Sequence, residues 1–519
     1  MISRIGTLLR TIRFIKPVQI IYQLKSRIIK VKSLNQYKIH AELKPIPLSI
    51  IPDLRNSNAA RADGLFNFLN LPHVFPGNID WNYSAHGKLW NYNLQYLDYI
   101  LQEDIPLDTR ISWIRSIYSC LNSGELKPEP YPASLRAMNL IRLFSTNPSL
   151  IIDYPDLQSD LYAELNYLHE HYEYHLLGNH LLENAFCMLM GGCYFQKTTW
   201  KMQAEDVLLK QLDEQILSDG AHFELSPMYH QIILLRVMEA ISILNINDAL
   251  YGFLRIKAEK MLGWLNQMTF ANGDIPHFND STDGIALRVD QLQKLAHLLN
   301  LDTCKSKLFD SGYRKITEGN IEMIADVHGI SPTYQPGHAH ADHLSFVLYS
   351  KGKPFIVDSG TSTYTISERR TWERSSIAHN TVTVNAMNQS EVWSGFRVGR
   401  RAKVKILEDQ KNMIKASILY PGVAHIRSFI VDSSSLIIQD EVKAEHSAAL
   451  RFFLHPSVKI KQQLDSEVQI ESGEIIRFEN CKKLMIKEYD FATGFNKLVK
   501  SKFIEVFFEG TCKSVIFTG

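Results

Sequence analysis

The chain is poor in cysteine, and its cysteines are scattered. Six cysteines lie among 519 residues, and no two of them form a C-x-x-C pair. This spacing is too sparse for a disulfide scaffold. It favours a reducing compartment, so we expect a cytoplasmic location.

Long apolar runs are also missing, as is negative charge at the start of the chain. No apolar run reaches the roughly 20 residues that a transmembrane helix requires. Residues 1–41 contain no acidic residue. They contain nine basic residues: Arg4, Arg10, Arg13, Lys16, Lys25, Arg27, Lys30, Lys32 and Lys38.

This basic start does not have the pattern of a secretory signal. Arg10, Arg13 and Lys16 interrupt every apolar run, and no small-residue cleavage site follows. We expect a retained amphipathic segment over residues 1–45. Two roles are open for it: packing on its own domain, or peripheral contact with an anionic membrane or a partner.

Net charge carries little information about partners. The formal net charge is +1, so no overall positive field indicates a nucleic-acid binder. The composition is 45% hydrophobic and 21% charged, which is typical of a folded globular protein. A chain of 519 residues predicts two large domains or three small ones. No oligomeric state is predicted.

Helical periodicity dominates the chain from about residue 90 to residue 310. Apolar residues recur at i, i+3, i+4 and i+7 in stretches such as LQYLDYILQ, LYAELNYLHEHYEYHLL and YHQIILLRVMEAISIL. Clusters rich in Asn, Gly, Pro and Asp separate these stretches. The pattern predicts antiparallel helix pairs, because no Val/Ile strand alternates with the helices.

The sequence changes character near residue 315. Short stretches rich in β-branched and aromatic residues follow, including LSFVLYS, PFIVDSG, RAKVKILE, KASILY and IEVFFEG. Turns separate them at intervals of roughly 8–12 residues, the signature of an antiparallel sandwich. We therefore expect a basic segment (1–45), a helical domain (46–314) and a β-sandwich domain (315–519).

Polar motifs fall where elements begin or end, which is where sites are usually built. Five motifs stand out: GNHLLEN, DGAHFELSPMYH, GHAHADHLSF, IVDSGT and AHNTVTVN. In this order they resemble the heparinase II/III-like polysaccharide lyases, including their alginate and oligoalginate relatives. The resemblance covers roughly residues 90–400. It implies an incomplete (α/α) toroid followed by an antiparallel β-sandwich, and β-elimination on a uronic acid of an acidic polysaccharide or oligosaccharide.

The resemblance also assigns roles to individual residues. Asn179 and His180 match the pair that flanks the substrate carboxylate, Tyr229 matches the catalytic tyrosine, and His338 matches the catalytic histidine. The C5 proton of a uronide is weakly acidic until donors neutralise the carboxylate, so Asn and His suit this chemistry. A base must then remove the proton and an acid must protonate the leaving oxygen. Tyr229 would be the acid and could also be the base, with His338 or His180 as the alternative base.

Further residues are candidates for substrate binding. Arg136, with Asn139 beside it, could reach a carboxylate in bidentate fashion or form a salt bridge along a helix. His222 and Glu224 share one loop and could bind sugar or cap a helix.

The resemblance implies a metal as well. His340, Asp358 and His379 match the positions that hold a structural zinc in several family members. On a strand, His338 and His340 would point to one face. A simple hairpin at Lys351–Lys353 would pair Asp358 with about Phe346, so the chain must bend to bring the ligands together.

Two alternatives to a lyase remain. One is a glycan-processing hydrolase of surface-polysaccharide biosynthesis, with Glu224 and Asp280 as the carboxylates that hydrolysis needs. The other is a non-catalytic glycan-binding protein, which the combination of Asn179, His180, Tyr229 and His338 argues against.

Overall fold

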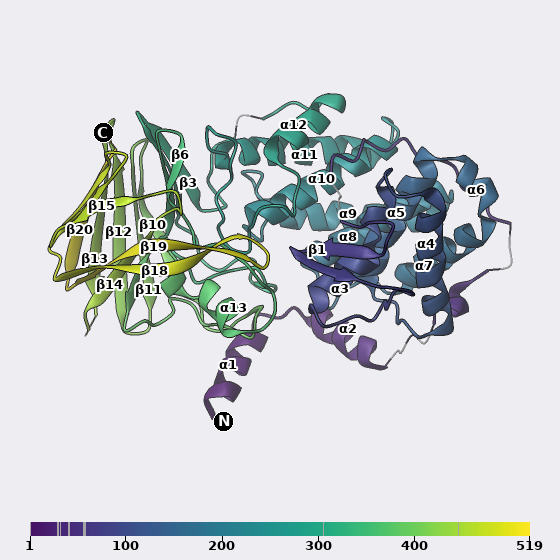
Figure 1. Ribbon diagram of the computed structural model, residues 1–519, viewed down its shortest axis with the longest axis horizontal. Helices are drawn as coiled ribbons and strands as arrows, with labels where there is room; N and C mark the ends of the chain where they lie inside the picture. The colour runs from purple at the N-terminus through teal and green to yellow at the C-terminus, as the bar shows by residue number, and fades with distance from the viewer. Residues whose placement is uncertain are drawn as a thin grey trace.

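The protein has a helical half and a β-rich half, seen side by side in the computed structural model in Figure 1. The structure describes residues 2–28, 31, 33–39, 42–55, 59–304, 306–444 and 446–518. Helices fill the right of the figure and strands the left, so the helix-then-sheet order expected from the sequence is confirmed. None of the helices within these described ranges is long and apolar enough to cross a membrane.

The chain begins with two helices outside both halves. These are α1 (Ile2–Ile12) and α2 (Pro17–Ile28), and the short turn η1 (Leu34–Tyr37) follows. The hairpin of β1 (Leu65–Phe68) and β2 (Leu71–Val74) then leads into the helical half.

The helical half is a toroid of alternating inner and outer helices. Its elements are α3 (Lys88–Tyr96), η2 (Asp98–Leu101), α4 (Leu107–Ser123), α5 (Pro130–Thr146), α6 (Ser149–Asp153), α7 (Pro155–Glu170), α8 (Gly178–Tyr194), α9 (Thr198–Gln215), α10 (Pro227–Ile243), α11 (Ala249–Met268) and α12 (Val289–Leu298). Along the chain, α3, α5, α8, α10 and α12 contact one another in turn. They form the inner layer, and α4, α7, α9 and α11 form the outer one.

The sequence of α8 explains why this helix belongs to the inner layer. Helix α8 is apolar almost all round, and nearly all of its residues are buried, as expected for a helix without a solvent face. Two glycines let its neighbours come close. A Cβ on Gly191 would lie 2.8 Å from the Leu165 side chain of α7, and one on Gly192 would lie 2.7 Å from the backbone of Lys201 in α9.

The β-rich half is a set of antiparallel sheets around one core. Its elements are β3 (Tyr313–Glu318), β4 (Ile321–Asp326), β5 (Phe346–Ser350), β6 (Lys353–Ile356), α13 (Glu368–Glu373), η3 (Ser376–Ala378), β7 (Val382–Val384), β8 (Val392–Trp393), β9 (Arg397–Val398), β10 (Lys403–Asp409), β11 (Met413–Tyr420), β12 (Val423–Val431), β13 (Ser435–Lys443), β14 (Ala448–Phe453), β15 (Ile460–Gln463), β16 (Glu467–Ile470), β17 (Ile475–Glu479), β18 (Lys483–Gly494), β19 (Lys497–Phe508) and β20 (Thr511–Phe517).

One eight-stranded sheet packs against two four-stranded sheets. The large sheet has the order β10-β11-β12-β13-β20-β17-β16-β15, and the smaller ones are β18-β19-β14-β7 and β3-β4-β5-β6. Inward residues of all three share one apolar core. In β10 and β11 exposure alternates residue by residue, because one face of each strand meets that core and the other meets water.

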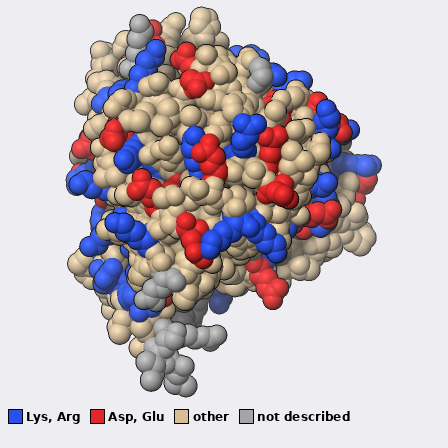
Figure 2. All heavy atoms as spheres, turned by 90° about the vertical axis from the view of Figure 1, so that its left-hand side faces the viewer, with Lys and Arg blue, Asp and Glu red and all other residues tan. Residues whose placement is uncertain are grey.

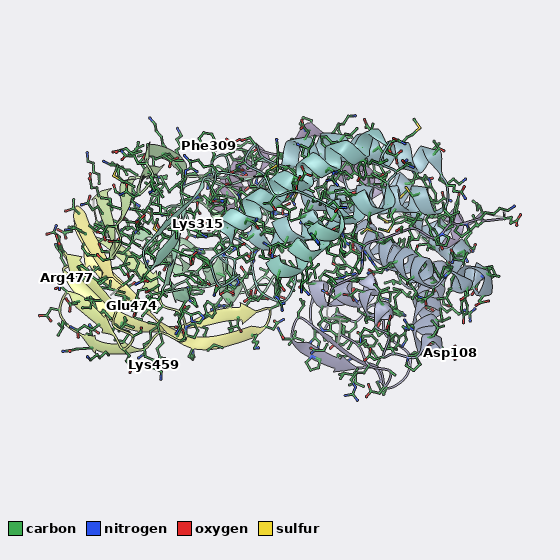
Figure 3. The ribbon with its side chains drawn as sticks, turned by 90° about the horizontal axis from the view of Figure 1, so that it is seen from above. Asp108, Phe309, Lys315, Lys459, Glu474 and Arg477 are labelled. Atoms are coloured by element: carbon green, nitrogen blue, oxygen red, sulfur yellow. The ribbon has the colours of Figure 1, made fainter. Side chains whose placement is uncertain are left out.

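Strand β3 joins the two halves. Lys315 of β3 donates to the carbonyl of Thr269 at the end of α11 over 2.6 Å, and Figure 3 shows Lys315 beside the helices. The Tyr313 hydroxyl donates over 2.6 Å to the carbonyl of Leu225, which precedes α10. By contrast, the outer face of the β-rich half carries basic and acidic residues interspersed, without a field of one sign (Figure 2).

Candidate active site

The site lies where the inner helices begin. Helices α5, α8 and α10 follow one another around the inner layer, and each carries an aromatic side chain in its first turn: Tyr131, His180 and Tyr229. The His180 and Tyr131 rings lie 4.3 Å apart. Since helix N-termini carry partial positive charge, this end of the toroid favours an anionic group.

Helix α8 starts at a tight turn that exposes its first residues to this space. Leu177 and Gly178 both have positive φ, 63° and 56°. A Cβ on Gly178 would lie 2.6 Å from the Gln335 side chain and 2.9 Å from that of Glu224, so only glycine fits there. The turn delivers Asn179, whose side-chain Oδ1 is buried without a hydrogen-bond partner.

His180 is paired with an acid that sequence reasoning missed. Its Nδ1 lies 3.2 Å from Oε2 of Glu173, a buried residue. Burial lowers the pKa of His180, but the charge and hydrogen bond of Glu173 outweigh this, so the pKa is raised. His180 is therefore suited to carry a positive charge toward an anionic ligand.

Tyr229 and His338 face each other across the boundary of the two halves. Tyr229 comes from the first turn of α10, which Ser226 caps by accepting from the Tyr229 amide. His338 comes from the loop before β5, and the two ring centroids are 3.9 Å apart. The Tyr229 hydroxyl lies 3.2 Å from that of Tyr364. Burial and the neighbouring Tyr364 raise the pKa of Tyr229 well above its usual value, so this phenol stays protonated.

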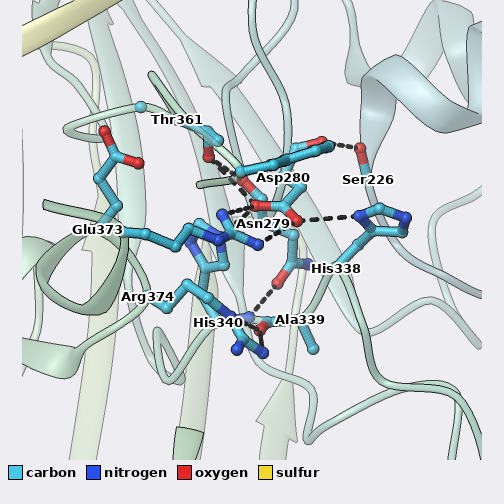
Figure 4. A network of polar contacts seen from close by, with 12 residues as sticks. Ser226, Asn279, Asp280, His338, Ala339, His340, Thr361, Glu373 and Arg374 are labelled. Carbon is cyan, nitrogen blue, oxygen red and sulfur yellow. Dashed lines mark hydrogen bonds and ion pairs between the residues drawn. The ribbon is translucent and has the colours of Figure 1, made fainter. Parts of the chain in front are cut away.

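A buried carboxylate, Asp280, holds His338 in place (Figure 4). Its Oδ2 lies 2.9 Å from Nδ1 of His338, and its Oδ1 lies 2.9 Å from Nε2 of His340. Arg370 binds both carboxylate oxygens. Burial alone would raise the pKa of Asp280, but Arg370 and the two histidines lower it well below the usual range. An ionised Asp280 must accept from His338, which leaves the Nε2 lone pair of His338 available as a base.

Glu224 lies on the other side of the same imidazole. Its Oε2 is 3.8 Å from Nε2 of His338, and its Oε1 accepts from the Asn179 amide over 3.3 Å. Burial raises the pKa of Glu224. This residue therefore links the start of α8 to His338.

Three residues selected from the sequence as sugar contacts point elsewhere. Arg136 is completely buried in an ion pair with Glu164. His222 is completely buried as well, with Nε2 3.0 Å from Oε1 of Gln215. Asn139 is buried and donates to the Tyr96 carbonyl. These positions argue against direct substrate contact, because each side chain is buried inside the toroid, although Nδ1 of His222 has no hydrogen-bond partner there.

The predicted metal ligands are only partly brought together. Nδ1 of His379 lies 2.7 Å from Oδ2 of Asp358, and the His340 and His379 ring centroids are 5.3 Å apart. His338 and His340 lie in a loop, not on a strand. Each hydrogen-bonds one oxygen of the Asp280 carboxylate. The β5–β6 hairpin ends at Ile356, paired with Leu348, so Asp358 leaves the sheet to reach His379.

Several buried polar atoms among these residues have no hydrogen-bond partner. Nδ1 of His340, Nε2 of His379 and both carboxylate oxygens of Asp342 lack hydrogen bonds. Burial raises the pKa of Asp342 to about 7. A second group lies nearby: the ligand atoms of Asp326, His328 and His343 all fall within 4.8 Å of one another. His343 belongs to the GHAHADHLSF motif, whereas Asp326 and His328 lie outside the five motifs.

Other site residues escaped sequence reasoning for identifiable reasons. Tyr364 stands a few residues beyond the IVDSGT motif, and its position in that motif's loop was the available signal. Glu173 lies within the stretch LYAELNYLHEHYEYHLL, which was expected to be helical throughout, and looks like an ordinary surface acid in the sequence. In the structure α7 ends at Glu170, so Glu173 lies in the loop before α8. Arg370 sits on α13, 90 residues from Asp280, and no local pattern joins the two.

Comparison with protein families gives matches over most of the chain. Residues 139–300 match the family described as Heparinase II/III N-terminus, and residues 301–516 match Heparinase II/III-like, C-terminal. Among curated proteins, a heparin-sulfate lyase of Bacteroides stercoris is 23% identical over 439 residues, covering 74% of this chain and 63% of the relative. An exo-oligoalginate lyase of Saccharophagus degradans is 30% identical over 111 residues, 18% of this chain and 15% of the relative.

The chain spans less than two thirds of the length of the curated heparin-sulfate lyases it matches. Among solved structures, a heparinase III matches with a TM-score of 0.70 at 17% identity, covering 93% of this chain and 88% of that one. A heparan sulfate lyase of Pedobacter heparinus matches with a TM-score of 0.56 at 18% identity, covering 96% and 87%. This chain is a member of the heparinase II/III-like family and has its toroid-plus-sandwich fold.

Proposed function

We propose that the protein is a polysaccharide lyase that cleaves a uronic-acid-containing glycan by β-elimination. The observation that carries the proposal is that Asn179 and His180 lie in the same site as Tyr229 and His338, at the N-terminal ends of the inner helices α5, α8 and α10. The names of the relatives favour heparan sulfate as the first substrate to test, with alginate as the second.

The first residues of α8 neutralise the uronate carboxylate in this mechanism. Asn179 and a protonated His180 are the hydrogen-bond donors, and the N-termini of α5, α8 and α10 add partial positive charge. Glu173 keeps His180 charged, since it raises the pKa of the imidazole despite burial. A charged His180 is a donor, which favours His338 over His180 as the base.

Proton transfer then divides between His338 and Tyr229. The Asp280 carboxylate occupies Nδ1 of His338, so Nε2 removes the C5 proton. Tyr229, protonated because its pKa is raised, donates its proton to the leaving O4. The electron pair of the broken C5–H bond forms the C4–C5 double bond as the C4–O4 bond breaks.

The geometry argues against hydrolysis by Glu224 and Asp280. A hydrolase needs its two carboxylates on either side of the glycosidic bond. Here the His338 ring lies between them, with Glu224 3.8 Å from one nitrogen and Asp280 2.9 Å from the other. Asp280 is also neutralised by Arg370, so it cannot act as a general acid.

The proposal is tested by the ultraviolet absorbance of the new double bond. Purified protein is incubated with heparan sulfate, heparin, alginate and a neutral glucan. Absorbance should rise with at least one uronide and not with the glucan. Release of reducing ends without absorbance would identify a hydrolase, and binding without cleavage of any uronide would identify a non-catalytic glycan-binding protein.

We also propose a structural zinc beside this site, as the family resemblance implies. The donor set fits in part: Nδ1 of His340 and Nε2 of His379 are buried without partners, and Asp358 is hydrogen-bonded to His379. Nδ1 of His340 and Nε2 of His379 would hold the ion, which would tie the His338 loop to the sandwich. Asp358, expected as a third ligand, lies on Nδ1 of His379 and would instead orient that ring. Its contribution would be structural, since acid, base and carboxylate donors are already present.

Metal analysis of single variants tests this proposal. His340→Ala and His379→Ala should each lose about one equivalent of zinc per chain and lower the melting temperature. His343→Ala is the matched control, because it belongs to the neighbouring group of Asp326 and His328. Zinc lost from His343→Ala but retained in His340→Ala would place the ion in that group instead. Less than a tenth of an equivalent in active wild-type protein would refute a metal at either place.

A further inference from the structure

Helix α1 binds the rest of the protein through its polar side. The Thr7 hydroxyl donates to Glu391 over 2.7 Å, and Nε of Arg10 donates to the same carboxylate over 2.8 Å. The Trp393 indole donates to the Thr11 hydroxyl over 3.1 Å. These contacts fix which way the helix faces.

The apolar side of α1 faces solvent as a result. Its exposed residues follow helical spacing: Ile5 (54%), Leu8 (40%), Leu9 (64%) and Ile12 (42%). A surface helix of a globular protein normally turns its apolar stripe toward the core. In Figure 1, α1 projects from the lower edge of the molecule, where it has room for an external surface.

Helix α2 repeats this arrangement. Gln19 is buried and Tyr22 packs on Tyr174, so this side meets the helical half. The other side is apolar and exposed: Ile20 (46%), Ile21 (61%), Leu24 (55%) and Ile28 (81%). Helix α2 lies at the same lower edge of Figure 1 as α1.

Charge identifies the kind of surface these stripes fit. Lys25 and Arg27 are exposed and fall on either side of the α2 stripe, 100° per residue around the helix. Arg13, between the helices, is exposed too. Residues 1–41 have no acidic side chain to oppose an anionic surface. Arg10 and Lys16 are already paired with Glu391 and Glu214, so they hold the segment to the protein.

We propose that α1 and α2 dock the protein on an anionic phospholipid bilayer. Both helices lie in the plane of the interface, with Ile, Leu and their neighbours among the upper acyl chains and Lys25 and Arg27 at the headgroups. An apolar stripe bordered by cations suits this boundary, where one side is hydrocarbon and the other is charged. The site at the mouth of the toroid takes no part in the docking.

Vesicle co-sedimentation of the full chain is the test. Vesicles of phosphatidylcholine containing phosphatidylglycerol should bind the protein, and pure phosphatidylcholine vesicles should bind it much less. Leu9→Gln with Ile21→Gln should reduce partitioning at least about tenfold. Lys25→Gln with Arg27→Gln should reduce partitioning onto the anionic vesicles about fivefold per residue. Added salt should abolish the difference between this variant and the wild-type protein.

Matched control variants distinguish docking through α1 and α2 from non-specific binding to vesicles. Ile152→Gln with Ile246→Gln removes two exposed apolar residues, 82% and 73% exposed, elsewhere on the helical half. Lys210→Gln with Lys294→Gln removes two exposed cations there. Neither control should change partitioning. Equal binding to both vesicle types, or equal effects of test and control variants, would overturn the proposal. So would a lipid-free dimer that Leu9→Gln with Ile21→Gln converts to monomer, since the stripes would then join two copies.

Discussion

Among single residues, the hydroxyl of Tyr229 has the most specialised environment. It lies 3.2 Å from the hydroxyl of a second tyrosine, Tyr364, and the Tyr229 ring packs against that of His338 at an interplanar angle of 30°. A phenol with a raised pKa is a poor base at neutral pH but remains a proton donor. In the proposed mechanism Tyr229 is therefore the acid and His338 is the base.

Replacing Tyr229 by Phe should remove only the proton donor. We expect turnover to fall by about 10²–10⁴-fold while KM changes little, because the ring and its packing remain. Steady-state absorbance assays give both constants. Tyr489→Phe removes a hydroxyl that binds the Leu454 carbonyl in the sandwich and should leave turnover unchanged. Near-normal turnover in Tyr229→Phe would exclude this phenol from the reaction.

His180 gives a prediction about pH. In the proposed mechanism the His180 imidazole must be charged to neutralise the substrate carboxylate, so activity should fall as pH rises through its pKa. Glu173 raises that pKa, and Glu173→Gln should move the alkaline limb of the pH–rate profile to lower pH. Glu129→Gln, beside Tyr92, serves as the control. An unchanged limb in Glu173→Gln would mean that His180 does not act as a cation.

At the scale of elements, the inner helices both position the site and depend on buried charge. Arg136 of α5 pairs with Glu164 of α7, and both are excluded from water. Arg142 pairs with Glu239, and Arg236 pairs with both Glu183 and Glu239. Such pairs fix how neighbouring helices sit, and breaking one leaves an uncompensated charge.

Arg136→Met should therefore damage stability and not substrate binding. Leaving Glu164 buried and unpaired costs about 3–5 kcal/mol of unfolding free energy. Denaturant unfolding measures this loss, and KM at low temperature should stay at the wild-type value. Adding Glu164→Leu should restore much of the stability. A raised KM with unchanged stability would instead show that Arg136 contacts the substrate.

At the scale of the whole molecule, the site exists only because two halves meet. Asp280 precedes α12 in the chain, and its partners His338, His340 and Arg370 all come from the β-rich half. The sandwich contains a similar cluster, in which Asp440 binds His425 and Arg427. Arg427 also donates to the carbonyls of Leu344 and Asn380 but forms no hydrogen bond with Asp280, His338 or Tyr229. The second cluster offers an internal control.

Asp280→Asn should lower both stability and turnover. The buried Arg370 loses its counter-charge, and His338 loses the acceptor that fixes its proton on Nδ1. We expect the melting temperature to fall and turnover of the folded enzyme to drop at least about 100-fold. Asp440→Asn should destabilise in a similar way without slowing turnover. Equal turnover losses in the two variants would show that Asp280 acts only on stability.

The sequence by itself determined the order of the halves and the chemistry available to them. Helical and strand periodicity are local, so the change of period near residue 315 appears as α12 ending at Leu298 and β3 beginning at Tyr313. Motif order was sufficient to identify the family. The selection of Asn179, His180, Tyr229, His338 and Glu224 needed only local patterns and the resemblance.

Only the tertiary structure decided which of the candidates share one space. Arg136 and Asn139 lie on the same α5 that opens at the site, but the turns of the helix carry them into the core. Asp280 and Arg370 are 90 residues apart and meet through the packing of two domains. The outward face of α1 depended on Glu391 and Trp393, which attract its polar side. Contacts between distant segments leave no periodic trace in a sequence, because each depends on how whole elements pack.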